Sequence, residues 1–331
     1  MLRIGYKASA EQFGPHELLE LAVIAEDVGF DSVFISDHLQ PWRHHGGHAP
    51  AVLPWLGAAL VSTKQVILGT SVLTPTFRYH PGVVAQAFAT LGCLAPGRVI
   101  LGVGSGESLN EAPLGADWPE PRERFARLKE AIELIQLLWR EERVSYDGTY
   151  FRTDRATIYD RPDTPVPLYL AASGPATTRL AGRVTDGFIC TSGKQRELYT
   201  DTLLPAVKEG AARAGRSEAD LDLMIEMKVS FDTDVQRARD DTRNWAALAL
   251  PPGVKTGVDD PLEMERLSDA LTVDQAATRW IVSSDPDEHV EAIREYVDMG
   301  FRHLVFHAPG HDQRRFLSLY AEQVVPKLRE E

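Results

Sequence analysis

Apolar stretches that suit buried strands alternate with amphipathic stretches along nearly the whole chain, and this alternation limits the possible folds most strongly. The expected strands cover residues 2–7, 32–35, 66–74, 98–107, 167–174, 187–194, 223–231 and 303–307. Apolar residues at helical spacing predict helices at residues 15–30, 51–63, 81–94, 119–143, 176–184, 235–248, 287–299 and 314–328, with a further helix that ends near residue 215. Apolar strands between amphipathic helices indicate a parallel sheet covered by helices on its outer face.

Eight such strands in 331 residues suit a closed (β/α)8 barrel better than an open sheet. No low-complexity linker divides the chain, so we expect one α/β domain, a TIM barrel, over residues 1–331. Insertions are expected at the carboxyl ends of the strands, approximately at residues 38–50, 108–119, 144–158 and 249–280. The third contains Asp147-Gly148 between aromatic residues, which predicts a hairpin. The fourth is expected to be irregular.

The net charge of -13, from 35 basic and 48 acidic residues, argues against several classes of partner. An acidic surface disfavours nucleic acid and anionic membranes, and a phosphate-bearing substrate would need a local basic cluster. Cys93 and Cys190 lie far apart without metal-ligand spacing, which fits a reducing compartment. The first residues lack an apolar signal core, and no apolar run is long enough to span a membrane. We therefore expect a cytoplasmic protein.

One expected strand ends in Asp37 and His38, followed by Pro41 and Trp42, and this pattern suggests acid/base chemistry. An isolated Asp-His pair is more often a cap and a backbone hydrogen bond than a catalytic pair. Here, however, polar residues follow every strand, and in a barrel those ends form the active site. These strand ends carry Lys7 to Glu11, Asp37 and His38, Ser71 to Thr74, Glu107 with Asn110, Ser173-Gly174, Thr191 to Lys194, Glu226 with Lys228, and His307. The gathering predicts an enzyme.

Two glycine-containing turns are candidate cofactor sites, although neither is specific. The stretch from Gly102 to Gly106 lacks the G-x-G-x-x-G spacing and a following ribose acid, so a nicotinamide site is weakly supported. Its small residues either admit a flat ring or phosphate or only form a tight turn, and the two interpretations are equally favoured. Ser173-Gly174-Pro175 precedes a helix whose first amides can bind an anion, although an ordinary helix start is commoner.

Other chemistries receive less support from the sequence. His44, His45 and His48 lie in a glycine-containing loop without a cysteine or carboxylate, so metal ligation is disfavoured. Trp42 is either a core aromatic or a residue that stacks on a bound ring. A G-x-S-x-G elbow is absent, which argues against acyl transfer by a nucleophilic serine.

At several blocks the sequence resembles one subgroup of the bacterial luciferase-like superfamily, the glucose-6-phosphate dehydrogenases that use the deazaflavin coenzyme F420. The blocks are GYKASAEQF (5–13), SDH (36–38), QPWRH (40–44), GTSVLTPTFRY (69–79), GFICTSGK (187–194) and HAPGHDQRRF (307–316). The resemblance covers nearly the whole chain. It implies a (β/α)8 barrel, usually a homodimer, with the deazaflavin in the barrel mouth.

The resemblance also implies which residues contact coenzyme F420. The matching positions are Asp37, Thr74, Ser105, Gly106, Asn110, Ser173, Gly174, Ala176 and Thr177. Ser71-Val72 matches the non-proline cis peptide of the family, and Ser105 and Ser173 look like small-residue variations on the pattern.

His38, Trp42 and Glu107 match the catalytic positions of the family, with Glu11 close by. The implied reaction oxidises the C1 hydroxyl of glucose 6-phosphate to 6-phosphogluconolactone, with a hydride passing to C5 of the deazaflavin. Two groups with different pKa values suit the two proton movements. We prefer His38 for the hydroxyl proton and Glu107 for the cofactor side, and the reverse assignment is also consistent with the sequence. Trp42 would shield the ring and orient the sugar.

Thr191, Lys194, Lys255 and Arg279 match the sugar-phosphate contacts of the family and supply the basic cluster that an acidic protein needs. Each alone would more often be a solvated surface group. Three alternatives stay open: an F420-dependent dehydrogenase of another sugar phosphate or alcohol, a flavin mononucleotide monooxygenase, and a non-catalytic cofactor-binding protein. The phosphate cluster argues against the second, and the presence of both His38 and Glu107 argues against the third.

Overall fold

The computed structural model describes residues 2–330, and within this range eight parallel strands close into a barrel. The barrel strands are β1 (Arg3–Ala8), β2 (Ser32–Ile35), β3 (Ile67–Thr70), β4 (Val99–Val103), β7 (Leu168–Ala171), β8 (Gly187–Thr191), β9 (Asp222–Phe231) and β11 (His303–His307). They pair in the order β9-β11-β1-β2-β3-β4-β7-β8, and the pairing of β8 with β9 closes the ring. The predicted (β/α)8 barrel is confirmed, with every expected barrel strand present.

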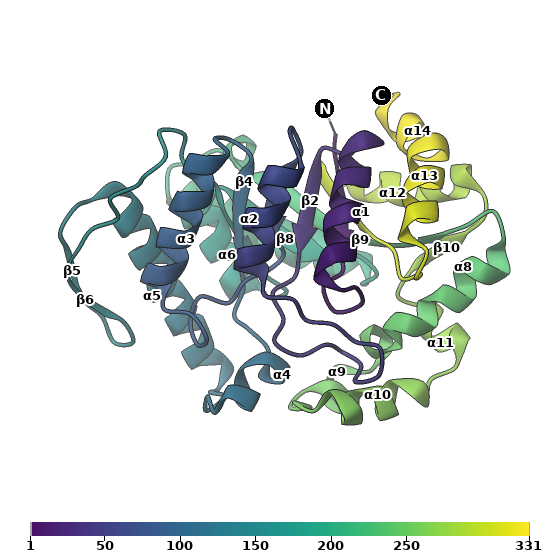
Figure 1. Ribbon diagram of the computed structural model, residues 1–331, viewed down its shortest axis with the longest axis horizontal. Helices are drawn as coiled ribbons and strands as arrows, with labels where there is room; N and C mark the ends of the chain where they lie inside the picture. Colours follow the sequence, from purple (N-terminus) through teal and green to yellow (C-terminus); the bar gives the residue numbers. More distant parts are fainter. Residues whose placement is uncertain (1, 331) are drawn as a thin grey trace.

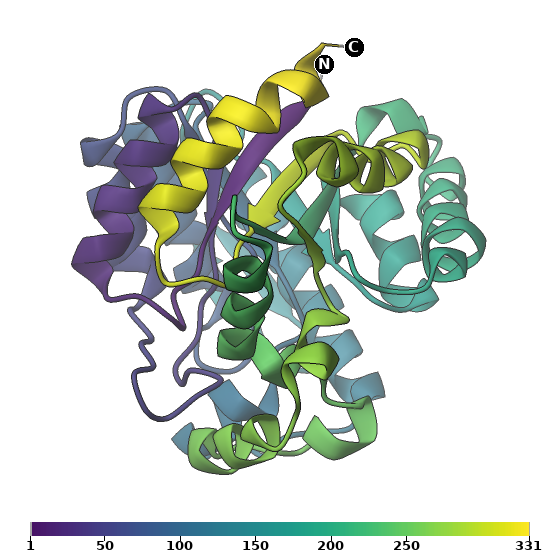
Figure 2. The same ribbon diagram turned by 90° about the vertical axis from the view of Figure 1, so that its right-hand side faces the viewer.

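Helices cover the outside of the barrel, and the carboxyl-terminal helices lie beside the first helix (Figures 1 and 2). The larger ones are α1 (Pro15–Asp27), α2 (Val52–Ser62), α3 (Pro81–Leu94), α5 (Pro121–Arg140), α6 (Pro175–Val184), α7 (Leu204–Arg213), α8 (Val235–Asp241), α12 (Pro286–Asp298) and α13 (Gln313–Gln323), followed by the short α14 (Val325–Arg329). Many begin with proline in the first turn, where its fixed φ and missing amide hydrogen cost little. In the described part of the chain, no helix combines the length and apolarity needed to cross a membrane.

The insertions contain more regular structure than expected. The segment 249–280 was expected to be irregular but contains α9 (Pro252–Lys255), α10 (Pro261–Asp269) and α11 (Val273–Ala277). The side chain of Asp260 accepts a hydrogen bond at the start of α10, and Thr272 and Gln275 form a capping box at α11. Such short helices depend on capping more than on apolar periodicity, which explains why periodicity missed them.

Other boundaries also differ from the expectation. A short strand that was not predicted, β10 (Ile281–Ser283), extends the sheet beside β9. The expected helix 235–248 is α helical only through α8 and continues as the 3₁₀ segment η4 (Thr242–Ala249), with Trp245 outside helical geometry. The hairpin β5 (Val144–Asp147) and β6 (Arg152–Ala156) confirms the turn prediction. The remaining short elements are α4 (Ser108–Glu111), η1 (Ala112–Leu114), η2 (Leu198–Leu203) and η3 (Glu218–Asp220).

Strands β3, β4 and β7 end earlier than the apolar runs suggested, so several predicted site residues lie in loops. β3 ends at Thr70, and the following peptide bond, Ser71–Val72, is cis, as the resemblance implied. Leu73 still forms an isolated parallel bridge with Val103. The loops therefore begin at the rim of the barrel, where side chains can face a bound molecule.

The interior of the barrel has its own hydrophobic layer. Val33 and Ile35 of β2 belong to the main core beneath the helices, whereas Phe34 between them belongs to a separate cluster. Alternation along a strand places Phe34 inside the barrel. Its cluster consists of Phe34, Ile100, Tyr169, Ile189, Met224 and Val305, all from barrel strands. This packed layer closes the barrel below the carboxyl ends, so a ligand can enter only from above it.

Strands β3 and β4 approach each other closely at Gly102. Thr70 Oγ1 donates to the carbonyl of Gly102 at 2.7 Å and accepts from its amide at 3.0 Å. A Cβ atom at Gly102 would overlap the carbonyl oxygen of Thr70 and lie 3.1 Å from Ile189 Cδ1. The barrel can close here only because residue 102 has no side chain.

Gly102→Ala is therefore expected to destabilise the protein by about 3 kcal/mol or more, because an overpacked contact against backbone cannot relax. Gly57→Ala in α2 is the matched control, because its Cβ would meet no described atom within 4 Å. The control should stabilise the helix by about 0.5–1 kcal/mol. Urea unfolding measures both changes, and equal stability of the two variants would contradict the close-approach argument.

Candidate active site

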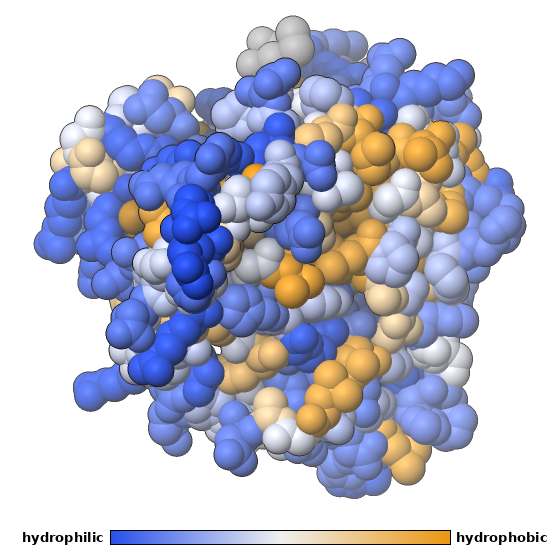
Figure 3. All heavy atoms as spheres, turned by 60° about the vertical axis from the view of Figure 1, so that its left-hand side comes forward, coloured by the Kyte–Doolittle hydropathy of each residue, from blue (hydrophilic) through white to orange (hydrophobic). Residues whose placement is uncertain are grey.

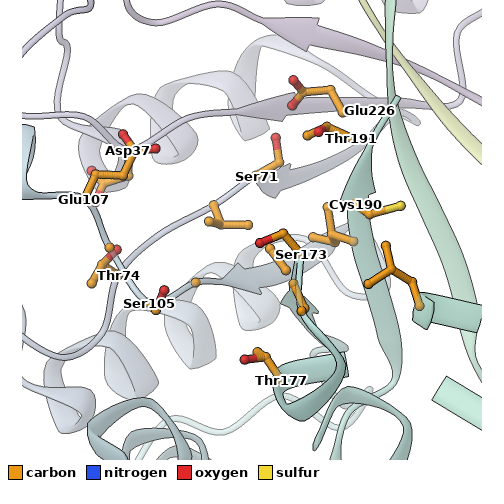
Figure 4. A pocket seen from close by; sticks show the side chains of 18 of the residues that line it. Asp37, Ser71, Thr74, Ser105, Glu107, Ser173, Thr177, Cys190, Thr191 and Glu226 are labelled. Atoms are coloured by element: carbon orange, nitrogen blue, oxygen red, sulfur yellow. The ribbon is translucent and has the colours of Figure 1, made fainter. Parts of the chain in front are cut away.

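A cavity of about 540 Å³ opens at the carboxyl ends of the strands (Figure 4). Figure 4 shows Asp37 and Glu107 at one end of the cavity, Thr191 and Glu226 at the other, and Ser71 between them. The lining comes from the ends of β2, β3, β4, β7, β8 and β9 and from their loops. Its volume lies within the range of small-molecule and cofactor sites.

The cavity brings together most of the residues that the resemblance assigned to the cofactor. Those that line it are Asp37, Ser71, Val72, Thr74, Ser105, Gly106, Asn110, Ser173, Gly174 and Thr177. Ala176 is exposed in the first turn of α6 and does not line the cavity. The structure also adds residues that the sequence did not suggest, including Ala171, Cys190 and Leu203.

Glycine residues form part of the wall of the cavity, and their surroundings indicate whether a flat ring could bind against it. A Cβ at Gly104 would lie 2.6 Å from Val72 Cγ2, and one at Gly106, whose φ is +83°, would lie 3.0 Å from Thr74. Val72 and Thr74 also line the cavity, so larger residues at positions 104 and 106 would push these side chains into it. At Gly174, by contrast, an added Cβ would meet no described atom within 4 Å. A ring can therefore approach the wall, and an anion can reach the amides at the start of α6.

His38 lies between two carboxylates at the edge of the cavity. Its Nε2 is 3.2 Å from Glu11 Oε1 and 3.9 Å from Glu107 Oε2. Glu11 is almost fully buried, whereas the side chain of Glu107 is 47% exposed. The two carboxylates can therefore play different roles, one supporting the imidazole and the other reaching a ligand or solvent.

The other ring nitrogen of His38 is held by the loop that follows β2. Nδ1 lies 3.1 Å from the carbonyl oxygen of Gln40 and 3.3 Å from Asn110 Nδ2, and these partners favour opposite tautomers. The shorter contact is to an atom that only accepts, so we assign the proton to Nδ1. Asn110 Oδ1 accepts from the amides of Leu39 and Gln40, which fixes the loop. His38 Nε2 then faces the carboxylates of Glu11 and Glu107.

Glu11 is suited to stabilise a protonated His38. Ser36 Oγ donates to Glu11 Oε2 at 2.6 Å. Burial alone would raise the pKa of Glu11, but His38, Lys7 and Ser36 together hold it below its ordinary value. Glu11 is therefore ionised at neutral pH and places a negative charge 3.2 Å from His38 Nε2.

Asp37 faces a buried ion network that the sequence analysis did not identify. Arg78 bonds Asp37 Oδ2 at 2.9 Å and Glu111 Oε1 at 3.1 Å, and both carboxylates are inaccessible to solvent. Burial raises the pKa of Asp37 and of Glu111 despite the guanidinium between them. Arg78 therefore ties the loop after β2 to α4. It lies within a block that resembled the family, but nothing in its spacing indicated this role.

A second buried charge cluster forms the floor beside the cavity. Glu226 contacts Lys228, lies 3.4 Å from Lys7 Nζ and is 3.5 Å from His307 Nδ1. Burial would raise the pKa of Glu226, but Lys228 and Lys7 hold it well below its ordinary value. Burial and the charge of Lys228 lower the pKa of His307 to about 4, so this histidine is neutral. Lys7 also donates to the carbonyl and hydroxyl of Ser71 at 2.7 and 2.8 Å.

The four predicted phosphate contacts differ in their relation to the cavity, and Thr191 lies at the end opposite Asp37 (Figure 4). Thr191 and Lys194 line the cavity. Arg279 donates to the carbonyl of Gly193 at 2.5 Å, and Lys255 Nζ lies 5.4 Å from the centroid of Trp42. Burial and neighbouring cations lower the pKa of Lys194 and of Lys255. The positive charges of Lys194, Lys255 and Arg279 are thus close enough to act on one another, and their role in binding a phosphate stays a prediction.

Trp42 connects this basic cluster with His38. The rings of Trp42 and His38 have centroids 6.0 Å apart. Trp42 also lines another cavity of about 180 Å³, together with Glu11 and Trp245. An aromatic face between a proton-transfer group and a cation is suited to orient a polar ring such as a sugar.

Comparisons with known proteins agree with this geometry. The luciferase-like monooxygenase family model matches residues 2–303. F420-dependent glucose-6-phosphate dehydrogenases from Nakamurella multipartita and Beutenbergia cavernae are 71% and 72% identical to this chain. Both alignments cover 99% of this chain, and they cover 97% and 98% of those proteins, respectively.

Solved structures show the same fold. An F420-dependent secondary alcohol dehydrogenase in complex with an F420-acetone adduct is 34% identical, with a TM-score of 0.94 and 99% coverage of both chains. A coenzyme F420 dependent tetrahydromethanopterin reductase from Methanopyrus kandleri is 23% identical, with a TM-score of 0.81 and 99% coverage of both chains. The second likeness bears on the fold alone.

The floor cluster leads to a prediction about stability. Glu226→Gln is expected to destabilise the protein by about 3–5 kcal/mol at neutral pH, because Lys7 and Lys228 lose their buried counter-charge. The folded-state pKa of Glu226 is depressed, so its contribution is present above the ordinary value of 4.5 and is lost as the pH falls below it. The difference in the free energy of unfolding between variant and wild type should therefore become smaller as the pH falls.

Urea unfolding across a pH series measures this difference. Glu123→Gln is the control, because Glu123 forms an exposed pair with Arg127 and should change stability by less than about 1 kcal/mol. A pH-independent difference would show that the charge of Glu226 is not responsible.

Proposed function

The chain belongs to the luciferase-like monooxygenase family, and from this premise we infer that it oxidises glucose 6-phosphate with coenzyme F420 as the acceptor. The reaction converts the C1 hydroxyl to a carbonyl and yields 6-phosphogluconolactone. One observation carries the inference: a histidine that contacts a buried carboxylate shares its cavity with Lys194, and the charges of Arg279 and Lys255 act on that lysine. The relatives that are named for this activity match the chain over almost its full length.

The residues of the cavity fit coenzyme F420. The small residues Gly104 and Gly106 leave room for a flat ring, and the open start of α6 suits an anionic tail. When bound, coenzyme F420 supplies the acceptor for the hydride that leaves C1 of the sugar. We propose that the residues matched by the resemblance hold it, with Asp37 and Asn110 on one side and Ser173 to Thr177 on the other.

The proton of the C1 hydroxyl goes to His38 Nε2 in this proposal. His38 is oriented through Nδ1 by the carbonyl of Gln40, and Glu11 stabilises the imidazolium. Glu107 is more exposed than Glu11 and lies 3.9 Å from the same ring nitrogen, so in this proposal its carboxyl group carries the proton needed on the cofactor side and exchanges it with solvent. Trp42 excludes water and orients the sugar. The different environments of Glu11 and Glu107 support this division of roles.

The phosphate group lies among Thr191, Lys194, Lys255 and Arg279 in our proposal. The positive charges of Lys194, Lys255 and Arg279 repel one another, and a bound phosphate dianion offsets this repulsion. A dehydrogenase of another sugar phosphate or alcohol is the second candidate, because the secondary alcohol dehydrogenase shares the fold so closely. The cation cluster favours a phosphate-bearing substrate over a simple alcohol, and it also disfavours a flavin mononucleotide monooxygenase. The His38–Glu11 pair disfavours a non-catalytic role.

We further propose that residues 1–331 act as one domain, that two copies form a homodimer, and that the protein works in the cytoplasm. Exposed apolar residues on α2 and α3, Val61, Val83 and Leu94, support a contact with a second copy. Figure 3 shows apolar side chains gathered towards the right of the molecule, where the rotation from the view of Figure 1 brings these helices. The unpaired thiols of Cys93 and Cys190 support a reducing compartment.

An absorbance assay tests the function. Purified protein is mixed with oxidised coenzyme F420 and glucose 6-phosphate, with glucose and other sugar 6-phosphates as comparisons. Loss of the visible absorption band with glucose 6-phosphate, and not with glucose, is the expected result. Faster loss with another sugar phosphate would change the substrate, and loss with none of them despite cofactor binding would contradict the proposal.

His38→Ala is expected to bind the cofactor normally but to lower kcat by about 10²–10⁴-fold, because the proton acceptor is lost. Fluorescence titration measures cofactor binding, and the absorbance assay measures turnover. His16→Ala on α1, whose side chain is 89% exposed, is the control and should retain full activity. Near-normal turnover of the His38 variant would remove this residue from its proposed role.

Lys255→Ala is expected to raise the KM for glucose 6-phosphate by about tenfold or more, because a charge-assisted contact to the phosphate is lost. The Kd for coenzyme F420 should not change. Lys208→Ala serves as the control, since Lys208 pairs with Glu218 on the outside of the barrel. Equal weakening of substrate and cofactor would argue against a role in phosphate binding.

A further inference from the structure

Glu265 of α10 holds the loop that follows Trp42. Its Oε2 accepts hydrogen bonds from the amides of His44 and His45, each at 2.9 Å. Its Oε1 lies 3.1 Å from Arg43, which also pairs with Asp269 at 2.7 Å. The side chain of Glu265 is 12% exposed, so it is better shielded than a typical surface ion pair. One carboxylate therefore connects two segments that are more than 200 residues apart in the sequence.

The same two segments share a hydrophobic contact. Ala247, Leu250 and Met264 form a small cluster separate from the main core, and Trp42 packs against it. Because the cluster is small, the position of α10 relative to Trp42 depends on few contacts. The bonds of Glu265 are the polar part of this attachment.

Lys255 lies on the same insertion, and its position is linked to Trp42. Its Nζ is 5.4 Å from the centroid of the Trp42 ring. The charges of Glu107 and Arg279 also act on Lys255. A shift of the loop or of the insertion would therefore move Trp42 and Lys255 apart.

We propose that Glu265 is a positioning residue for the sugar phosphate: it fixes the Trp42 loop against α10 so that Trp42 and Lys255 together form the substrate site. This inference rests on the proposed function and deepens it. Glu265 acts through other residues and touches neither the cavity of the cofactor nor its lining. Its loss should therefore change substrate affinity and leave cofactor affinity unchanged.

Glu265→Gln is the direct test, because the amide keeps the shape but places a donor against Arg43 or against the loop amides. The KM for glucose 6-phosphate should rise by about tenfold, as expected for the loss of charge-assisted bonds. The Ki of inorganic phosphate as a competitive inhibitor should rise in parallel. The Kd for coenzyme F420, measured by fluorescence, should stay within about twofold.

Glu263→Gln is the matched control on the same helix. Within residues 2–330, Glu263 pairs with Arg266 of the same helix and forms no hydrogen bond or ion pair with the loop. Exposed pairs of this kind contribute little, so the control should behave as wild type in all three measurements. An effect of similar size in the control would show that α10 is merely sensitive to charge.

A double-mutant cycle with Lys255→Ala asks whether Glu265 acts through Lys255. If it does, adding Glu265→Gln to Lys255→Ala should change KM by less than about threefold, because the positioned group is already gone. A full second factor of about ten would show independent effects and overturn this link.

The outcomes distinguish the positioning role from the function itself. Wild-type protein that reduces no coenzyme F420 with glucose 6-phosphate overturns the proposed function. Active wild type with an unchanged KM in Glu265→Gln overturns the positioning role, as does a joint loss of kcat, cofactor affinity and thermal stability. If Glu265→Gln does not fold, Arg43→Gln replaces it. A KM rise of about threefold is then expected, because the ion pair is lost while the hydrogen bonds from the loop amides to Glu265 remain.

Discussion

The pairing of β8 with β9 closes the sheet, and this closure determines where every polar strand end must lie. In the described chain, the parallel strands point the same way, so their carboxyl ends meet at one rim above the packed layer around Phe34. Closure also removes water from the interior. The charged groups of Glu226 and Lys228, which lie two residues apart on β9 and face the same side, must therefore be paired.

Charge interactions connect the buried cluster around Glu226 with His38. Lys7 lies near Glu226, binds Ser71, and helps to keep the pKa of Glu11 below its ordinary value. Glu11 in turn contacts His38. A lysine near the end of the first strand thus supports the charge of the carboxylate that contacts His38. If His38 has the proposed role, the same side chains serve both the stability of the barrel and its chemistry.

Much of the architecture could be predicted because it follows from local pattern. Apolar strands, amphipathic helices and the rule that strand ends form the site were enough to place His38 and Glu107 together. Side-chain contacts across the barrel could not be predicted from local pattern. Lys228 contacts His307, for example, because of the register of β9 against β11. The link from Arg78 to Asp37 depends on how two loops fold. The helices of the insertion were missed because caps and contacts, rather than periodicity, stabilise them.

The proposed phosphate site gives an acidic protein a physical means of selecting a phosphate-bearing substrate. Burial lowers the pKa of Lys194, Lys255 and Arg279, and neighbouring positive charges lower the pKa values of both lysines further. Each cation is therefore less stable in the free site than it would be in water. A phosphate dianion offsets the desolvation and the repulsion together, whereas an uncharged sugar offsets neither. In this proposal, selectivity arises from the cost of holding these cations close, which requires that the insertion carrying Lys255 be held firmly against the barrel.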